Sequence, residues 1–245
     1  MPHSSTTGLA APLSSRPSKP SEETPGSGLA EAAYAAIKEA IRSNRFEPGY
    51  HAGEVEIARQ LGMSRTPVHQ AMARLQEEGL VRIQPKRGIL ICGLSPAELA
   101  DAYEIVVALE GAAAERLARQ PQPSRWAATD TLAALIDTME SALRASDLAG
   151  WAAADEEFHE TLVAACGNTR LQRMAGTIAD QLHRARMFTL KLRPLPVESA
   201  AQHRAIVDAL RGGEATAARE AAAAHRRSAC AQILPLVAKL GLSRL

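Results

Sequence analysis

The chain has 245 residues and a net charge of +1, because 28 lysines and arginines face 27 acidic residues. This balance excludes a globally basic nucleic-acid binder, so DNA contact would need a local basic patch. No apolar run is long enough to span a bilayer, which predicts a soluble protein with no membrane partner. Three isolated cysteines form no C-x-x-C pair and predict a reduced, cytoplasmic setting.

The length predicts two modest domains and a tail. Residues 1–28 are rich in Ser, Thr, Pro and Gly and are predicted to be disordered. From residue 29 to residue 45, Tyr34, Ile37 and Ile41 recur on one face of an amphipathic helix. This helix starts a domain that is predicted to run from residue 29 to residue 93.

Residues 54–79 predict a helix, a glycine turn and a second helix. Gly62 ends the first helix where a positive φ is cheap, and Pro67 fits the first turn of the second. This is the helix-turn-helix arrangement, whose second helix enters the major groove, and Arg65 stands at that helix's N-terminus. The apolar positions expected in the core are Val55, Ile57, Ala58, Leu61, Val68, Ala71, Met72 and Leu75.

Two short apolar runs, residues 80–84 and 88–91, flank the basic sequence Pro85-Lys86-Arg87-Gly88. This order predicts a hairpin, the wing of a winged helix-turn-helix, whose tip reaches the minor groove or phosphates. A small helical core with solvated charges is the alternative, and the wing favours DNA binding. The local basic patch would consist of Arg59, Arg65, Arg74, Arg82, Lys86 and Arg87.

The second half of the chain shows only helical periodicity. Ser95 and Glu98 form a capping box at its start, with Pro96 at the first helical position. Turn residues separate about six helices that end near residue 240. Short connections imply antiparallel neighbours, so the fold is predicted to be mainly α, with an all-α antiparallel bundle over residues 94–245.

Polar residues interrupt the apolar stripes of this bundle. In the helix from residue 148 to 166, Asp155 and His159 lie one turn apart on the apolar face. His203 and His225 hold similar positions on two later helices. A buried carboxylate needs a compensating charge, and three neutral imidazoles converging on it would form a metal site with open positions. Taken singly, each histidine is more often a core or surface residue.

The N-terminal motifs are Pro48-Gly49, Glu54, Ile57-Ala58, Leu61-Gly62, Ser64-Arg65-Thr66-Pro67-Val68, Leu75, Glu78-Gly79-Leu80-Val81 and Arg87-Gly88. They resemble the GntR family of bacterial transcription regulators. The resemblance implies that Arg65 and Thr66 contact bases or phosphates and that Arg87 and Gly88 form the wing tip. His69 replaces the usual arginine and lacks its bidentate fork, so half-site preference would differ. The expected DNA-binding residues are Arg65, Thr66, His69, Arg74, Lys86, Arg87 and Gly88.

The second half carries the motifs Asp155-x-x-Phe158-His159, Gly167-Asn168-x-x-Leu171, Glu198-x-x-x-x-His203-x-x-Ile206 and Ala218-x-x-x-x-x-x-His225. They resemble the FCD-type effector domain of the FadR branch of GntR regulators. The resemblance implies a helical bundle that binds a divalent metal ion and then a small organic acid on the metal. Zinc is the expected ion, and nickel, manganese and iron suit the same ligands. The implied ligands are Asp155, His159, His203 and His225.

One departure from this second resemblance concerns the effector. Relatives carry arginine in a Glu-Val-Arg-like triplet of the first helix, where this chain has Glu104-Ile105-Val106. The missing charge predicts an effector less acidic than a dicarboxylate or sugar acid. Arg184 and Arg186 are candidate residues for pairing an anion, and His183 is a candidate wall residue.

Three functions are open to the helical domain. An all-α metalloenzyme is disfavoured, because Glu156-x-x-His159 has no second copy and no nucleophile elbow, phosphate loop or zincin motif is present. A dimerisation module with a purely structural metal is the second alternative. The favoured prediction is a non-enzymatic, metal-dependent sensor of a small organic acid. It would act as a homodimeric repressor on a palindromic operator.

Overall fold

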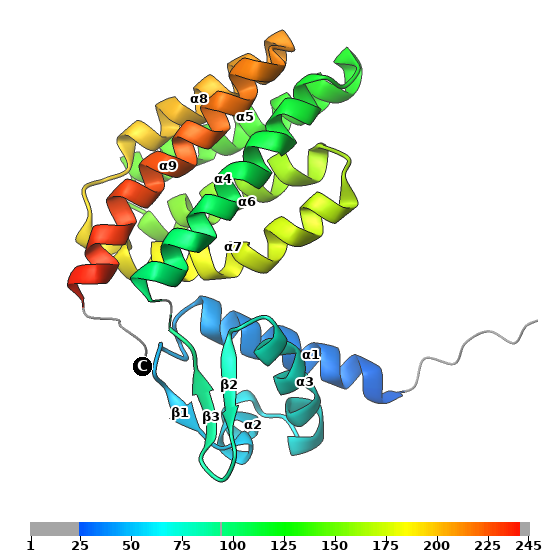
Figure 1. Ribbon diagram of the computed structural model, residues 1–245, viewed down its shortest axis with the longest axis vertical. Coiled ribbons are helices and arrows are strands. Elements are labelled where there is room, and N and C mark those ends of the chain that lie inside the picture. Colours follow the sequence, from blue (N-terminus) through cyan, green and yellow to red (C-terminus); the bar gives the residue numbers. More distant parts are fainter. Residues whose placement is uncertain (1–24, 94, 241–245) are drawn as a thin grey trace, which may run out of the picture.

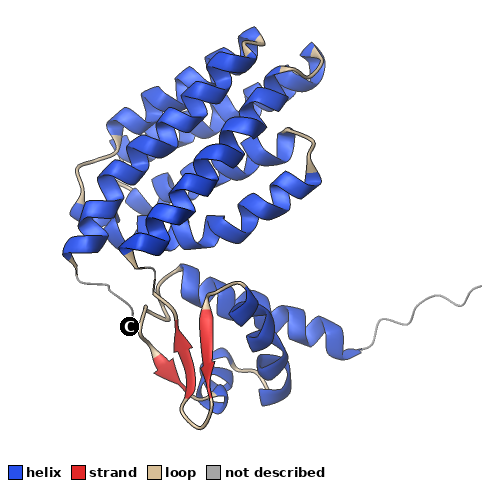
Figure 2. Ribbon diagram, in the orientation of Figure 1, coloured by secondary structure: helices blue, strands red, loops and turns tan. Residues whose placement is uncertain are grey.

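The computed structural model describes residues 25–93 and 95–240, which form two domains stacked one above the other (Figure 1). Helix α1 begins at Pro25, so residues 25–28 are helical and the prediction of disorder is wrong for them. The rest of the predicted tail, residues 1–24, lies outside the described residues. Among the described residues, strands occur only in the N-terminal domain (Figure 2).

The N-terminal domain is a winged helix-turn-helix. Gly62 ends α2 with a φ of 67°, and Gly79, with a φ of 72°, turns the chain from α3 toward the wing. The sheet order is β1-β3-β2 with antiparallel neighbours, and Ile83 lies opposite Ile89 in the wing. The elements are α1 (Pro25–Arg42), β1 (His51–Ala52), α2 (Glu54–Leu61), α3 (Arg65–Glu77), β2 (Val81–Gln84) and β3 (Gly88–Ile91).

An apolar core joins the three helices to the sheet. Ile57 is fully buried, whereas Val55, which was expected in this core, is 64% exposed. The two residues are two positions apart on one helix and therefore face opposite sides of it. At the wing, Gly88 has a φ of 98°, and a Cβ atom there would lie 2.7 Å from the carbonyl oxygen of Ala52. The wing is thus seated directly on β1.

Four residues, 92–95, separate strand β3 from the helical domain. The Ser95 side chain accepts a hydrogen bond from the Glu98 backbone, and the Glu98 carboxylate accepts one from the Ser95 backbone, which is the predicted capping box. The helices are α4 (Pro96–Ala118), α5 (Gln122–Arg144), α6 (Leu148–Ala165), α7 (Thr169–Thr189), α8 (Val197–Gly212) and α9 (Ala215–Lys239), with a short 3₁₀ helix, η1 (Leu190–Leu192), after α7.

The six long helices pack as a bundle. Helices α4 and α9 lie side by side, and α5 packs against α6 and α8 (Figure 1). The main core includes Trp151, Phe158, Leu162, Ile206 and Leu210, all at most 2% exposed. Trp151, Phe158 and Leu162 lie on α6, which also carries the buried polar residues Asp155 and His159. No helix among the described residues is long and apolar enough to cross a membrane.

Candidate functional site

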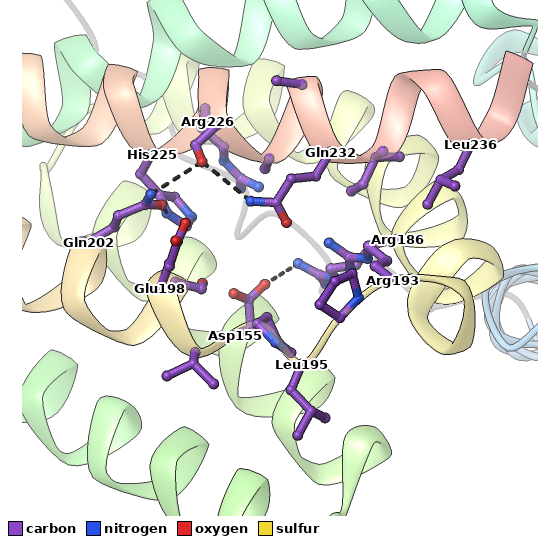
Figure 3. Close-up of a pocket in the computed structure, with 18 of the residues that line it drawn as sticks. Asp155, Arg186, Arg193, Leu195, Glu198, Gln202, His225, Arg226, Gln232 and Leu236 are labelled. Carbon is purple, nitrogen blue, oxygen red and sulfur yellow. Dashed lines mark hydrogen bonds and ion pairs between the residues drawn. The ribbon is translucent and has the colours of Figure 1, made fainter.

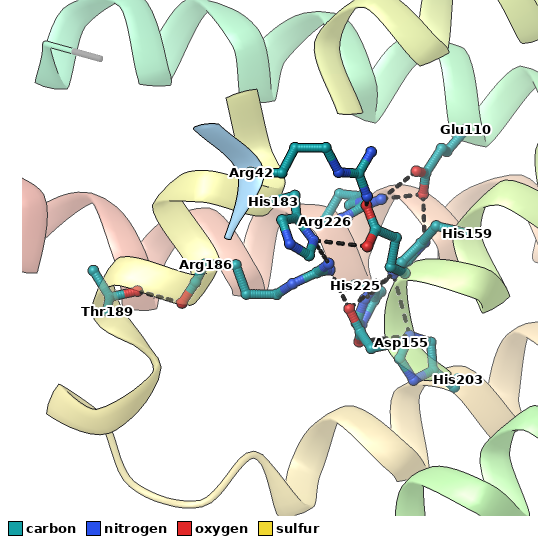
Figure 4. Close-up of polar contacts among 11 residues, drawn as sticks. Arg42, Glu110, Asp155, His159, His183, Arg186, Thr189, His203, His225 and Arg226 are labelled. Atoms are coloured by element: carbon teal, nitrogen blue, oxygen red, sulfur yellow. Dashed lines mark hydrogen bonds and ion pairs between the residues drawn. The ribbon is translucent and has the colours of Figure 1, made fainter. Parts of the chain in front are cut away.

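Four polar side chains from three helices meet inside the bundle (Figure 4). Helix α6 supplies Asp155 and His159 one turn apart, α8 supplies His203, and α9 supplies His225. One nitrogen or oxygen atom of each lies within 4.8 Å of the others, and all four residues are at most 5% exposed. The structure therefore brings together the four residues that the sequence singled out, and we call them the histidine cluster.

Hydrogen bonds outside the histidine cluster determine which ring nitrogen faces inward. The Nδ1 atom of His159 lies 3.0 Å from a carboxylate oxygen of Glu110. The Nδ1 atom of His225 lies 2.9 Å from the side-chain oxygen of Gln202, whose amide nitrogen donates to Ser228. Since both neighbouring oxygens are acceptors, each Nδ1 carries the proton and each Nε2 presents a lone pair. These two Nε2 atoms lie 3.3 Å apart.

Burial controls the protonation of the histidine cluster. It lowers the pKa of His159 and His225 well below the usual range, and it lowers the pKa of His203 to about 4. Burial alone would raise the pKa of Asp155, but Arg186 and the neighbouring histidines outweigh it, and that pKa is lowered. At neutral pH the cluster therefore consists of three neutral imidazoles and one carboxylate.

This set of donors fits a divalent metal ion. Two lone pairs that face each other at 3.3 Å repel, and a cation that accepts both removes the conflict. The Nε2 atom of His203 lies 3.4 Å from that of His159 and 3.6 Å from an oxygen of Asp155. Three imidazoles and one carboxylate are ligands that zinc and similar ions accept. They complete a tetrahedral set, so a further ligand would need an ion that takes five or six ligands.

Two buried arginines flank the histidine cluster. Arg186 of α7 forms an ion pair with Asp155, and its Nε atom has no hydrogen-bond partner among the described residues. Arg226 of α9 binds both carboxylate oxygens of Glu110, which also holds His159. Each buried carboxylate beside the histidines is therefore matched by one buried arginine.

A cavity of about 650 Å³ opens on one side of the histidine cluster, toward α8, α9 and the segment that precedes α8 (Figure 3). Asp155, Arg186 and His225 line its inner part, together with apolar side chains such as Leu195. Arg193 also lines it, and its buried Nη2 atom has no partner in the described part of the chain. We call this space the first cavity.

A second cavity, of about 610 Å³, lies on the other side of the histidine cluster. His159 lines its inner part, and Lys38 and Arg42 of the winged domain line it from α1. Arg186 and Arg226 line both cavities. These two arginines therefore stand between the first cavity and the second.

The structure separates the two arginines that were candidates for pairing an anion. Arg186 lines both cavities, whereas Arg184 lines neither. The two are two positions apart on α7 and so point to different sides of the helix. The guanidinium of Arg184 is buried near Cys92, and burial lowers its pKa to about 10. His183, the candidate wall residue, lies 2.8 Å from Glu156 and lines neither cavity.

The recognition helix α3 presents its N-terminal residues on the surface. Arg65, Thr66 and His69 are all exposed. The Nε atom of Arg65 donates to Glu54 at 3.0 Å, and the Nδ1 atom of His69 lies 2.7 Å from the other oxygen of the same carboxylate. Glu54 therefore holds two of the predicted DNA-binding side chains, Arg65 and His69, beside each other.

The other residues predicted to contact DNA fall into two groups. Lys86 and Arg87 are exposed at the wing tip, where Lys86 adopts a φ of 64° before Gly88. Arg74 instead stacks on Tyr34, with its guanidinium carbon 3.6 Å from the ring centre, and pairs with Glu31. Its contacts hold α3 against α1, so Arg74 is less available to DNA than the wing residues.

Four residues of the site were not found from the sequence: Glu110, Arg193, Gln202 and Arg226. Glu110 and Gln202 orient histidines, and the two arginines line the first cavity. The one available signal was Glu110, a charged residue on the apolar face of α4, four positions after Val106. Val106 itself is buried and lines the second cavity.

Comparisons with known proteins agree with both halves of the structure. Residues 29–91 match the family of bacterial regulatory proteins called the gntR family, and residues 101–228 match the FCD domain. An uncharacterised HTH-type transcriptional regulator in the TAR-I ttuE-ttuC' intergenic region of Agrobacterium vitis is 62% identical over 56% of this chain and 80% of its own length.

Two further proteins extend the comparison over most of the chain. A probable D-xylose utilization operon transcriptional repressor of Paenarthrobacter nicotinovorans is 31% identical over 76% of this chain and 80% of its own length. The solved structure of E. coli McbR/YncC has the same fold, with a TM-score of 0.73, 18% identity, and coverage of 85% of this chain and 97% of that one. The matched gntR family and the two sequence relatives are named as regulators and not as enzymes. The chain therefore belongs to the GntR family of bacterial regulatory proteins, as a DNA-binding transcriptional regulator whose helical part is an FCD domain.

Proposed function

We propose that the chain is a metal-dependent repressor whose affinity for DNA is set by a small organic acid bound beside the histidine cluster. The observation that carries this proposal is the pair of inward lone pairs on His159 and His225, 3.3 Å apart in a buried site. An apolar or hydrogen-bonded core would not place two acceptors face to face. A divalent ion held there would supply positive charge, and an ion that takes five or six ligands would also keep a coordination position for a carboxylate.

The first cavity suits an anionic ligand. Arg186 and Arg193 line it side by side (Figure 3), and each has a buried N–H group with no partner among the described residues. Asp155 balances Arg186, so Arg193 and a bound ion would leave an excess of positive charge, which the exposed Glu198 offsets only in part. These groups favour a carboxylate that binds the ion and the arginines.

This arrangement changes the expectation drawn from Val106. The missing arginine of α4 predicted a weakly acidic effector, but Arg186, Arg193 and Arg226 bring three other guanidinium groups to the first cavity. We propose that the cavity accepts a carboxylate despite Val106, with its far end against the apolar residues of the segment before α8.

On the DNA side, we propose a homodimer that places two α3 helices in successive major grooves of a palindromic operator. Arg65 and His69, held together by Glu54, would contact bases or phosphates, and Lys86 and Arg87 would contact the backbone. One of the relatives is named as a repressor, which supports the direction of control proposed here.

Thermal unfolding with a panel of small organic acids tests the sensing half of this proposal. The protein is stripped with chelator, and half of it is reloaded with zinc. One acid should raise the unfolding midpoint only in the zinc-loaded protein, because stabilisation grows with ligand concentration relative to Kd. The same acid should bind more weakly to Arg193→Gln, while the zinc affinity of that variant stays at the wild-type value.

The other outcomes select among the alternatives. Stabilisation by zinc with no further effect of any acid would favour a structural metal in a dimeric DNA-binding protein. No effect of zinc or of the other divalent ions would overturn the metal site. Arg65→Ala should weaken binding to a duplex that the wild-type protein selects from a random pool, and unchanged affinity would overturn the assignment of the recognition helix.

A further inference from the structure

The two cavities differ in how their cationic groups are paired. In the first cavity, Arg186 and Arg193 keep buried N–H groups without partners in the described part of the chain. In the second cavity, Lys38 and Arg42 both bind carboxylates. The second cavity is therefore a poor site for an anion, because its cations already have carboxylate partners. These ion pairs must have a function other than binding a ligand.

Those ion pairs belong to a continuous series of polar contacts between the two domains, and Figure 4 labels Asp155, Arg186, His183 and Arg42 of this series. Arg186, which pairs with Asp155, also lies 3.0 Å from the Nδ1 atom of His183, and that atom is 2.8 Å from Glu156. Glu156 then pairs with Arg42 of the winged domain. We call this series of contacts the ion-pair chain, and its members in order are Asp155, Arg186, His183, Glu156, Arg42, Asp180, Lys38 and Glu78.

The far end of the ion-pair chain reaches the recognition helix. Asp180 of α7 is 3% exposed and binds Arg42 and Lys38, each at 2.5 Å through a different oxygen. Lys38 is in turn 3.2 Å from Glu78, the C-cap residue of α3, which also accepts a hydrogen bond from Tyr34 at 2.7 Å. Charge-assisted contacts of this kind are strong and specific in direction. The end of α3 is thereby tied to α7.

We propose that Glu156 and Asp180 are positioning residues that transmit the state of the histidine cluster to the recognition helix through Arg42 and Lys38. The inference rests on the proposed function and adds how that site controls DNA binding. Glu156 is the residue next to Asp155 on α6, yet its carboxylate faces the winged domain and binds Arg42. One turn of α6 thus serves the candidate metal site and the domain junction at once.

Arg186 gives the ion-pair chain two alternative arrangements. Its guanidinium binds Oδ2 of Asp155, whereas Oδ1 of Asp155 faces His203, so a cation that takes both oxygens competes with Arg186 for this carboxylate. Arg186 then turns to an anion in the first cavity or takes full hold of His183, whose Nδ1 atom can accept from Arg186 or donate to Glu156 but cannot do both at once. Either movement of Arg186 changes the contacts of His183 and Glu156, and therefore changes the ion pair between Glu156 and Arg42. Two discrete arrangements biased by one site are what coupling between sites requires.

Zinc alone, with two variants and a matched control, tests this chain. Arg42→Gln and Glu156→Gln each remove one charge at the junction and leave the four candidate ligands in place. Arg204→Gln is the control, because Arg204 also bridges two carboxylates, Asp137 and Glu140, but within the bundle. Zinc affinity is measured by calorimetry, and DNA affinity is measured on a duplex that zinc-free wild-type protein selects from a random pool.

The expected result is a zinc-dependent change in DNA affinity of about fivefold or more in wild type and Arg204→Gln. In Arg42→Gln and Glu156→Gln the change should fall to near one, with zinc affinity within about twofold of wild type. Hydrogen exchange gives a readout independent of DNA: zinc should alter protection of α1 (Pro25–Arg42) in wild type and not in Glu156→Gln.

Two contrary results are distinguishable. If zinc binds and changes DNA affinity equally in wild type and in both junction variants, the ion-pair chain is not the route, and the proposed function stands. If neither zinc nor nickel, manganese or iron binds wild type, the proposed function fails and this inference fails with it. Conservative Arg42→Lys should restore part of the coupling, since it keeps the charge but not contact with both carboxylates.

Discussion

The two domains place their charged residues in opposite ways. In the winged domain the residues expected to contact DNA, such as Arg65 and Arg87, are exposed. Water solvates their charges, and Arg65 also donates to Glu54. In the helical domain Glu110, Asp155, Arg186 and Arg226 are at most 8% exposed. Burying charge is costly unless each group is paired, so a chain keeps such groups inside for a reason beyond stability. The contrast suggests that recognition takes place at one surface and sensing inside the other domain.

The largest expected effect comes from removing a candidate metal ligand. His159→Ala should weaken zinc binding roughly 1,000-fold, because a four-ligand site shares about 10–16 kcal/mol among its ligands. Binding to the selected duplex should persist in zinc-free protein, as the winged domain has its own core. Calorimetry measures the first quantity and fluorescence anisotropy the second. His69→Ala, a histidine of the other domain, is the control, and equal zinc affinity in both variants would remove the internal site from the comparison.

A pH effect of similar size is expected in zinc-free protein. Burial lowers the folded-state pKa of His203 to about 4, from an ordinary value of 6.5. In the unfolded chain, His203 therefore binds a proton as the pH falls through 6.5. In the folded chain, the same ring binds its proton only near pH 4. The stability from this group is complete above pH 6.5 and falls as the pH drops toward 4, by on the order of 3 kcal/mol.

Urea unfolding at several pH values between 7.5 and 4.5 measures this loss. His203→Gln lacks the titrating ring, so its free energy of unfolding should depend less steeply on pH, by up to one proton per molecule. The same slope in both proteins would show that His203 is not held neutral, and would weaken the contrast between exposed charges in the winged domain and paired, buried groups in the helical domain.

A smaller effect is expected at the DNA surface. Arg65→Ala should weaken binding to the selected duplex about 10- to 100-fold, which corresponds to about 1–3 kcal/mol for a specific base contact. Zinc affinity should not change, because Arg65 lies in the other domain. Arg173→Ala, an exposed arginine of α7, serves as the control. Equal loss of DNA binding in both variants would mean that Arg65 contributes only general charge.

The smallest effect concerns the support of a histidine. Gln202→Ala removes the acceptor that holds Nδ1 of His225 and should weaken zinc binding about tenfold. Calorimetry at fixed pH measures it. Gln232→Ala, another glutamine that lines the first cavity, is the matched control. A loss confined to Gln202→Ala would sharpen the assignment of the inward-facing nitrogens, and equal affinities in both variants would contradict it.

Local signals in the sequence were enough to predict most helices and the wing, but they predicted only part of the candidate site. Glycine turns and apolar spacing predicted α2, α3 and the wing, and the polar residues in apolar stripes predicted that Asp155 and the three histidines converge. Strand β1 has only two residues and carries no pattern of its own. Its existence depends on pairing with β3, which is a contact between distant parts of the chain.

The parts of the site that were missed also depend on tertiary contacts. Gln202 and Glu110 act only through the rings they touch, and no spacing in the sequence joins them to His225 or His159. Arg184 and Arg186 are the same residue type on the same helix, so the sequence does not distinguish them. Only the packing of α7 decides which one faces the cavities. Val106 signalled a missing charge, but the sequence held no sign that arginines of other elements line the same space.

The four-residue connection between β3 and α4 has a consequence for how such regulators diversify. A junction this short leaves little chain between the two modules, so recombination there would keep each module whole. The new DNA-reading module would still lack matched partners for Asp180 and Glu156 unless its first helix also carried cations at the positions of Lys38 and Arg42. Exchange of operator specificity between relatives should therefore succeed most readily when the incoming winged domain has cationic residues at the positions of Lys38 and Arg42.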